Sequence, residues 1–266
     1  MKFRQIRVLS VVILFQFLTG VAMGEFVHQR TKLEHLSKRA KQIWVVGYTN
    51  STLEDAIKDL EISFANGADA IVFEGSDYKK LDLYLTEIRK KYPKAVLGVN
   101  FLGGEDNLHS YAQTFELARK HKTQIAWTDF SGVDLINEAP EVSLHDILAK
   151  KPEETFYVSG IHMKYSTLID ANKPIELSAQ QAMGFVSGIV ITGPKTGVAT
   201  DPEKARRVRE VIGIYPMGAA SGVSAENVAS ILPYIDFVLV NTSISDNNHR
   251  IIPEKLKQLR KAMGEI

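Results

Sequence analysis

Short apolar runs alternate with amphipathic stretches from Ile43 to the carboxyl end of the chain, and this alternation constrains the fold more than any other feature. Strands that alternate with helical patterns are typical of parallel β/α units, in which helices cover a parallel sheet. Eight strand–helix pairs fit the chain, which predicts an α/β fold with a single (β/α)8 TIM barrel. The predicted strands lie at 43–48, 70–73, 95–99, 124–127, 155–162 and 188–191, within 214–223, and at 237–240.

Helix start and stop signals fall between the apolar runs. Ser51–Glu54 has the spacing of a capping box, and Asn66-Gly67 is a natural end for the helix that follows it. Thr200–Glu203 marks another helix start, because proline suits the first turn and the acidic side chains complement the helix dipole. The other predicted helices lie at 78–91, 108–121, 144–149 and 175–185, from Ser224 onward, and at 253–263.

An open, doubly wound sheet would also alternate strands and helices. Such sheets usually carry a glycine-rich fingerprint directly after the first strand. Here that turn reads Tyr48-Thr49-Asn50, with no such pattern. The absence favours the closed barrel.

Composition is that of an ordinary globular protein and narrows the function classes. The chain has 266 residues, 45% of them hydrophobic and 24% charged, which suits one large domain. A net charge of +1 gives no electrostatic reason to expect nucleic acid, whose binding needs a clustered basic surface. With no cysteine, the chain forms no disulfide, thiolate nucleophile or zinc–thiolate site.

The amino terminus has the layout of a signal peptide. Basic residues within Met1–Arg7 precede the apolar segment Val8–Val21, and small residues follow in Ala22–Gly24. An uncleaved membrane anchor and a true start at Met23 are the alternatives, although the apolar segment is short for a full span. A real leader implies an exported or membrane-associated protein, whereas a start near Met23 implies a cytoplasmic one. We therefore divide the chain into a leader (1–24), a polar, basic lead-in (25–41) and the barrel (42–266).

Small, hydrogen-bonding residues end each of the last three predicted strands, within Ser187–Ser245. The strand ends of a parallel barrel meet at one mouth, and the loops after strands seven and eight commonly hold phosphate. Exposed backbone N–H groups, a glycine that permits close approach and the positive end of a helix are what an anion needs. The predicted phosphate-binding residues are Ala220, Ser221, Gly222, Asn241, Thr242 and Ser243.

Several segments resemble signatures of the BtpA family. Gly188–Gly197, which reads GIVITGPKTG, resembles that family's "IVTGxxTG", and Ala220–Val228, ASGVSAENV, is similar to its "GSGvtxeNv". Leu97–Asn100 matches a strand-three "GVN", and Ala70–Glu74 resembles a strand-two segment that ends in an acid. The resemblance covers the chain from Ile43 onward.

The resemblance implies a ribulose-phosphate-binding type of TIM barrel, in a family named for a cyanobacterial factor needed for photosystem I biogenesis. No settled reaction comes with the family, and a leader segment is not expected in it. Two positions depart from its pattern: Ala220 replaces the first glycine of "GSG", and Asn241 replaces the glycine of "VGTS" at strand eight. The added Asn241 side chain would either crowd a phosphate pocket or donate to it.

Polar residues at the other strand ends are the candidates for chemistry. Two carboxyls at a barrel mouth can act as acid and base, and Lys164 is a candidate Schiff-base or phosphate-binding amine. No compact ligand spacing supports a metal site at Glu74, Asp129 and His162, and no cofactor is indicated. The predicted catalytic residues are Glu74, Asp129, His162 and Lys164, and the predicted substrate-binding residues are Asn100, Thr192 and Lys195.

Two functions from different classes fit these observations. The first is an enzyme, an isomerase, lyase or hydrolase that acts on a small phosphorylated metabolite. The second is a noncatalytic assembly or biogenesis factor that engages a protein complex through its surface. The sequence names neither the partner of such a factor nor the oligomeric state, and a homo-oligomer is compatible with both functions.

Overall fold

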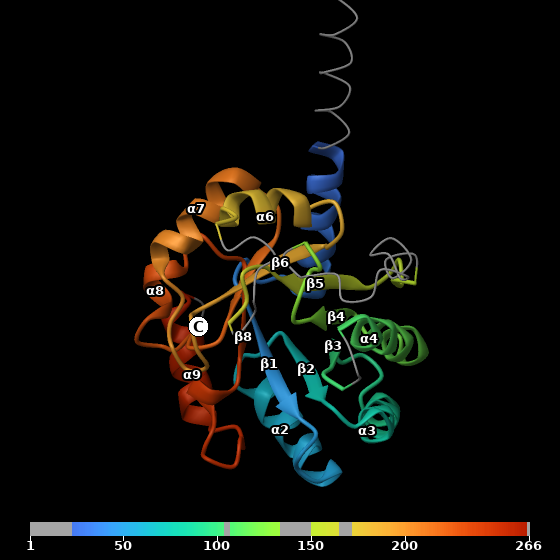
Figure 1. Cartoon of the computed structure of the whole chain (residues 1–266). Coiled ribbons are helices and arrows are strands. Elements are labelled where there is room, and N and C mark those ends of the chain that lie inside the picture. Colours follow the sequence, from blue (N-terminus) through green and yellow to red (C-terminus); the bar gives the residue numbers. More distant parts are fainter. Residues whose placement is uncertain (1–22, 104–106, 134–149, 165–171, 265–266) are drawn as a thin grey trace, which may run out of the picture.

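Eight parallel strands close into a barrel in the computed structural model, which describes residues 23–103, 107–133, 150–164 and 172–264 (Figure 1). Neighbours in the chain are neighbours in the ring, and β8 pairs with β1. The predicted (β/α)8 TIM barrel is confirmed. The strands are β1 (Gln42–Tyr48), β2 (Ala70–Gly75), β3 (Leu97–Phe101), β4 (Ile125–Thr128), β5 (Phe156–Gly160), β6 (Gly188–Thr192), β7 (Met217–Ala220) and β8 (Phe237–Val240).

Helices follow the strands and surround the barrel (Figure 1). The helix expected at 144–149 lies outside the described residues. The labelled helices are α2 (Leu53–Ala65), α3 (Tyr78–Lys91), α4 (Asn107–His121), α6 (Ile175–Ala182), α7 (Pro202–Ile212), α8 (Val228–Ile231) and α9 (Pro253–Ala262), and Thr242–Ile244 forms a 3₁₀ turn.

Side-chain caps fix the starts of α2, α3 and α7. At α7, Asp201 accepts from the Glu203 N–H and Pro202 occupies the first turn, as the sequence predicts. At α2 the cap lies one residue later than the predicted box, because the Thr52 side chain accepts from the Asp55 N–H. The hydroxyl of Ser51 instead donates to the Tyr48 carbonyl.

Most strand bounds differ from the prediction by one or two residues, and β5 and β3 are instructive examples. β5 ends at Gly160, because the chain turns at His162, whose φ is 42°. β3 begins two residues later than predicted, at Leu97, after the turn at the end of α3.

Strand alternation divides the core into two parts. Ile43, Val45, Ile71 and Phe73 face the surrounding helices, whereas their neighbours face the barrel interior. Near the amino-terminal end of the interior, the Trp44 and Phe237 rings stack with centroids 4.0 Å apart. Both strand faces are buried, which explains the near-continuous apolar runs in the sequence.

A helix over residues 23–36 covers the amino-terminal end of the barrel and includes most of the segment expected to be a polar lead-in, 25–41 (Figure 1, blue). Leu33 is 2% exposed and joins the interior cluster, and the Leu33 carbonyl accepts from the Gln42 side chain. Arg30 reaches the Ile214 carbonyl and pairs with Asp236. Leu33 and these polar contacts therefore hold the helix against the barrel. Across the described residues, no helix combines the length and apolar character needed to cross a bilayer.

We expect Gly218→Ala to lower the free energy of unfolding by about 1–3 kcal/mol, because overpacking a core forces its neighbours apart. A Cβ at Gly218 would lie 2.2 Å from the Phe237 ring. Gly184→Ala is the control, since its Cβ would meet nothing closer than 3.6 Å. Urea denaturation of both variants measures the difference, and equal stabilities would contradict this packing.

Candidate active site at the mouth of the barrel

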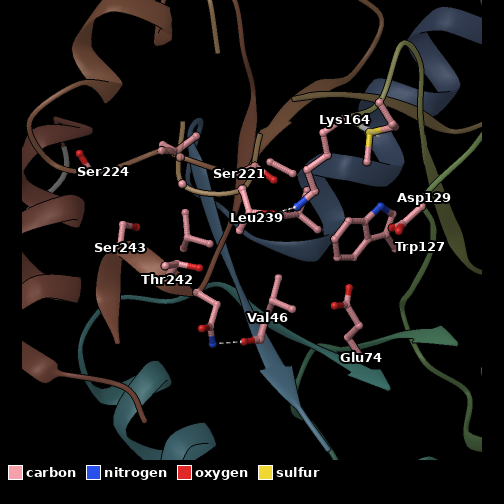
Figure 2. Close-up of a pocket in the computed structure, with 18 of the residues that line it drawn as sticks. Val46, Glu74, Trp127, Asp129, Lys164, Ser221, Ser224, Leu239, Thr242 and Ser243 are labelled. Atoms are coloured by element: carbon pink, nitrogen blue, oxygen red, sulfur yellow. Dashed lines mark hydrogen bonds between the residues drawn. The ribbon is translucent and has the colours of Figure 1, made fainter. Parts of the chain in front are cut away.

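A cavity of about 250 Å³ opens at the carboxyl-terminal ends of the strands (Figure 2). Nine of the predicted site residues line it: Glu74, Asp129, Lys164, Ala220, Ser221, Gly222, Asn241, Thr242 and Ser243. The predicted residues Asn100, His162, Thr192 and Lys195 are not part of its lining. Most of the site residues predicted from the sequence therefore lie around one cavity.

The two-residue period of the strands explains why polar side chains lie at the open end of this cavity. Val46, Trp127, Ala220 and Leu239 belong to the interior cluster and form an apolar floor. The residue two positions further along each strand points the same way, one layer nearer the mouth. Directly after β4 that residue is Asp129, two positions beyond Trp127. Ala220, predicted to bind phosphate, thus contributes a methyl group to the floor.

The carboxyls of Glu74 and Asp129 are joined by one amide. Asn100 Nδ2 donates to Glu74 Oε2 at 3.0 Å and to Asp129 Oδ1 at 3.2 Å. Asn100 is 1% exposed, so it supports the pair from within the wall. In Figure 2 the labelled Glu74 and Asp129 lie on the same side of the cavity. The predicted substrate-binding role of Asn100 is therefore better described as positioning.

Burial raises the pKa of Glu74 to about 8, and the nearby charge of Asp129 adds to the effect. The pKa of Asp129 is also raised, again chiefly by burial. The Asn100 amide and the Lys164 amine oppose both shifts. The two carboxyls share the Asn100 amide and both resist ionisation, which favours a state in which one of them keeps its proton.

Lys164 brings a positive charge to the mouth (Figure 2). Its backbone N–H donates to Thr192 Oγ1, and its amine donates to Thr196 Oγ1, each at 2.9 Å. Thr192 is 1% exposed. Thr192, predicted to bind substrate, instead anchors the loop that carries Lys164.

The loops after β7 and β8 offer free backbone donors to the cavity. Ser221 and Gly222 both have positive φ, 65° and 67°. A Cβ at Gly222 would lie 2.2 Å from the Val198 backbone, so position 222 requires glycine for space as well as conformation. Within the described part of the chain, the N–H groups of Gly222, Val223, Thr242 and Ser243 form no hydrogen bond.

The Ser243 hydroxyl adds to this set of donors. Its oxygen is buried and has no hydrogen-bond partner among the described residues. We call the loop segments Ser221–Val223 and Thr242–Ser243 the anion loops. Both segments line the cavity, and Figure 2 shows Thr242 and Ser243 on the side away from Glu74 and Asp129.

Asn241 neither crowds the anion loops nor donates to them. Its amide donates to the Val46 carbonyl at 2.7 Å, a bond drawn in Figure 2. Its Oδ1 accepts from Ser245 Oγ and lies 3.1 Å from His249 Nδ1. The side chain expected to contact phosphate thus ties the end of β8 to β1.

Two predicted residues lie outside the cavity. His162 Nε2 lies 3.1 Å from Ser178 Oγ, at the start of α6. Lys195 is exposed in the loop after β6. The turn at His162 directs its side chain away from the position that a longer β5 would have given it.

Sequence reasoning missed Tyr48, Trp127 and Met163, which also line the cavity. Tyr48 lies two residues after the floor residue Val46, so continuing the strand period would have identified it. Among the described residues, no group of three or more histidine or acidic side chains is arranged to hold a metal ion.

No protein-family model matches the chain, so membership of the BtpA family remains a prediction from the motifs. An uncharacterised protein of Archaeoglobus fulgidus is 25% identical over 225 residues, which cover 73% of this chain and 82% of that protein.

Solved barrels resemble the structure across most of its length. Phosphoribosyl anthranilate isomerase from Thermus thermophilus has a TM-score of 0.56 and 14% identity, over 84% of this chain and 98% of that one. (S)-3-O-geranylgeranylglyceryl phosphate synthase from Thermoplasma acidophilum, solved with its substrate sn-glycerol-1-phosphate, has a TM-score of 0.58 and 13% identity, over 88% and 97%. At these identities the likeness establishes the TIM-barrel fold alone.

Proposed function

We propose that the protein is an enzyme that binds a small phosphorylated carbonyl compound at the barrel mouth and acts on it by proton transfer. One observation carries the proposal: a single cavity has the anion loops on one side and the Glu74–Asp129 pair on another. The named neighbours support it, because one is an isomerase of a phosphoribosyl compound and another was solved with a glycerol phosphate.

The anion loops supply the phosphate site. Four backbone N–H groups without partners, at Gly222, Val223, Thr242 and Ser243, would donate to phosphate oxygens. Hydrogen bonds to a charged group contribute about 1.5–3 kcal/mol each, so three or four of them anchor a phosphate. Lys164 adds a positive charge at the same mouth.

The carboxyl pair supplies the acid and the base. In an isomerisation, ionised Asp129 takes a proton from the carbon beside the carbonyl, and protonated Glu74 gives its proton to the carbonyl oxygen. When that carbon carries a hydroxyl, the product is an enediol. Glu74 then takes the proton of that hydroxyl, and Asp129 returns its proton to the former carbonyl carbon, which gives the isomer. The raised pKa of Glu74 keeps it able to donate at neutral pH. A lyase could use the same pair to form and protonate an enediol.

The motifs at Gly188–Gly197 and Ala220–Val228 lead us to propose that the enzyme is BtpA-like. In the alternative role, that of an assembly factor, the protein would catalyse no reaction. Loss of both charges of the carboxyl pair would then leave its function intact.

We expect Gly222→Ala to weaken binding of inorganic phosphate at least about tenfold, because the Cβ would collide with the Val198 backbone and displace the anion loop. Gly213→Ala is the matched control: Gly213 also has positive φ, but a Cβ there would meet nothing within 4 Å. Isothermal titration calorimetry measures both. Equal phosphate affinities in the two variants would show that phosphate does not bind at these loops.

Glu74→Gln and Asp129→Asn should each lower turnover by about 100-fold or more, since acid–base catalysis contributes about 10²–10⁴. Phosphorylated sugars that raise the melting temperature would be incubated in D₂O, and NMR would follow deuterium exchange beside the carbonyl. The control is Glu54→Gln, whose carboxylate is 79% exposed on α2. Unchanged exchange in both site variants would refute their assigned roles.

Glu74 also links stability to pH. Its pKa in the folded protein lies above the ordinary value of 4.5, so the folded state binds the proton more tightly. Its contribution to stability is therefore full below about pH 4.5 and is lost as the pH rises through about 8. Relative to wild type, Glu74→Gln should gain about 1–3 kcal/mol of unfolding free energy between about pH 5 and pH 9. Urea denaturation measures this difference, and a flat difference would show that Glu74 ionises normally.

A further inference from the structure

Tyr48 lies between the two functional halves of the cavity. The anion loops follow β7 and β8, Tyr48 ends β1, and Glu74 lies on β2. These four strands are consecutive around the closed barrel. Tyr48 is also the direct register partner of Glu74. A ligand that reaches from the anion loops toward the carboxyls along this side of the ring passes Tyr48.

The phenolic hydroxyl of Tyr48 is unused. The side chain lines the cavity, and its hydroxyl makes no hydrogen bond to any other described residue. Burial, together with the charges of Glu74 and Asp129, raises the pKa of Tyr48 to about 12. The phenol therefore keeps its proton and remains a donor at neutral pH.

The Tyr48 ring is held in place from the β8 side. The His249 ring meets it edge-on, with centroids 4.8 Å apart. His249 Nδ1 lies 3.1 Å from Asn241 Oδ1, and the Asn241 amide in turn donates to the Val46 carbonyl on β1. The same side chains thus fix the end of β8, which leads into an anion loop, and the ring of Tyr48.

The charges around Tyr48 restrict which ligand groups can bind beside it. A ligand with a second acidic group near the carboxyl pair would be repelled by the ionised member of that pair. A neutral carbonyl or hydroxyl oxygen meets no such repulsion and accepts from a phenol. The region beyond the phosphate is therefore suited to an oxygenated, uncharged carbon chain.

We propose that Tyr48 is a specificity-determining residue, whose hydroxyl donates to a carbonyl or hydroxyl oxygen on the carbons next to the phosphate ester. The inference rests on the proposed function, because it takes the phosphate to occupy the anion loops. It deepens that function by naming the ligand class: compounds with a single phosphate and a neutral, oxygen-bearing chain.

The test uses two probes of equal carbon number, sn-glycerol 1-phosphate and n-propyl phosphate, with inorganic phosphate as the reference. Calorimetry with the full chain should show that wild type prefers glycerol phosphate to propyl phosphate by about threefold to tenfold, the worth of one neutral hydrogen bond. Tyr48→Phe removes only the phenolic oxygen and should abolish that preference, leaving the affinity for propyl phosphate within about twofold. Tyr234→Phe, a substitution before β8 and outside the cavity lining, is the matched control.

The outcomes separate the two proposals. If wild type binds inorganic phosphate but does not prefer glycerol phosphate, Tyr48 is not a specificity residue and the phosphate site stands. The same conclusion follows if Tyr48→Phe retains the preference or weakens both probes equally. If none of the three phosphates binds, the proposed function fails and the role of Tyr48 fails with it. If Tyr48→Phe does not fold, a wild type without the preference still overturns the role of Tyr48, and Tyr48→Leu, which also removes the hydroxyl, tests a preference that is present.

Discussion

The site depends on strand alternation within a closed ring. Because every second side chain of a strand points inward, the residue two positions beyond an apolar floor residue lies at the mouth. Val46 leads to Tyr48, Val72 to Glu74 and Trp127 to Asp129. Closure then brings together side chains that are far apart in the sequence. If any strand shifted by one residue, its polar side chain at the mouth would turn to face the surrounding helices.

Burial gives these polar groups their chemistry. The apolar floor and the Asn100 bridge hold two carboxyls out of bulk water, and desolvation is the largest cause of the raised pKa at both. The helix over residues 23–36 covers the opposite end of the barrel, where Leu33 joins the interior cluster. The carboxyl pair and the anion loops therefore share one mouth, while the other end is filled by packing.

Much of the fold and part of the site followed from the sequence. The apolar runs gave the strands, and their polar ends gave Glu74, Asp129 and the anion loops, because both signals are local. Contacts between distant segments gave no such signal. The amide of Asn241 could not be assigned before Val46 and His249 were known to lie beside it. His162 was misplaced because its positive φ ends β5 early, and Tyr48 was missed because the strand period was not followed one step further.

The proposed function requires the anion loops and a carboxyl pair of raised pKa to line one cavity. The most direct measurement is an NMR titration of the Glu74 carboxyl carbon, with and without inorganic phosphate. We expect a pKa of about 8 in the free protein, raised further when phosphate is bound, because a nearby anion disfavours ionisation. A Glu74 pKa near the ordinary value of 4.5, unmoved by phosphate, would rule out a buried acid beside a phosphate site.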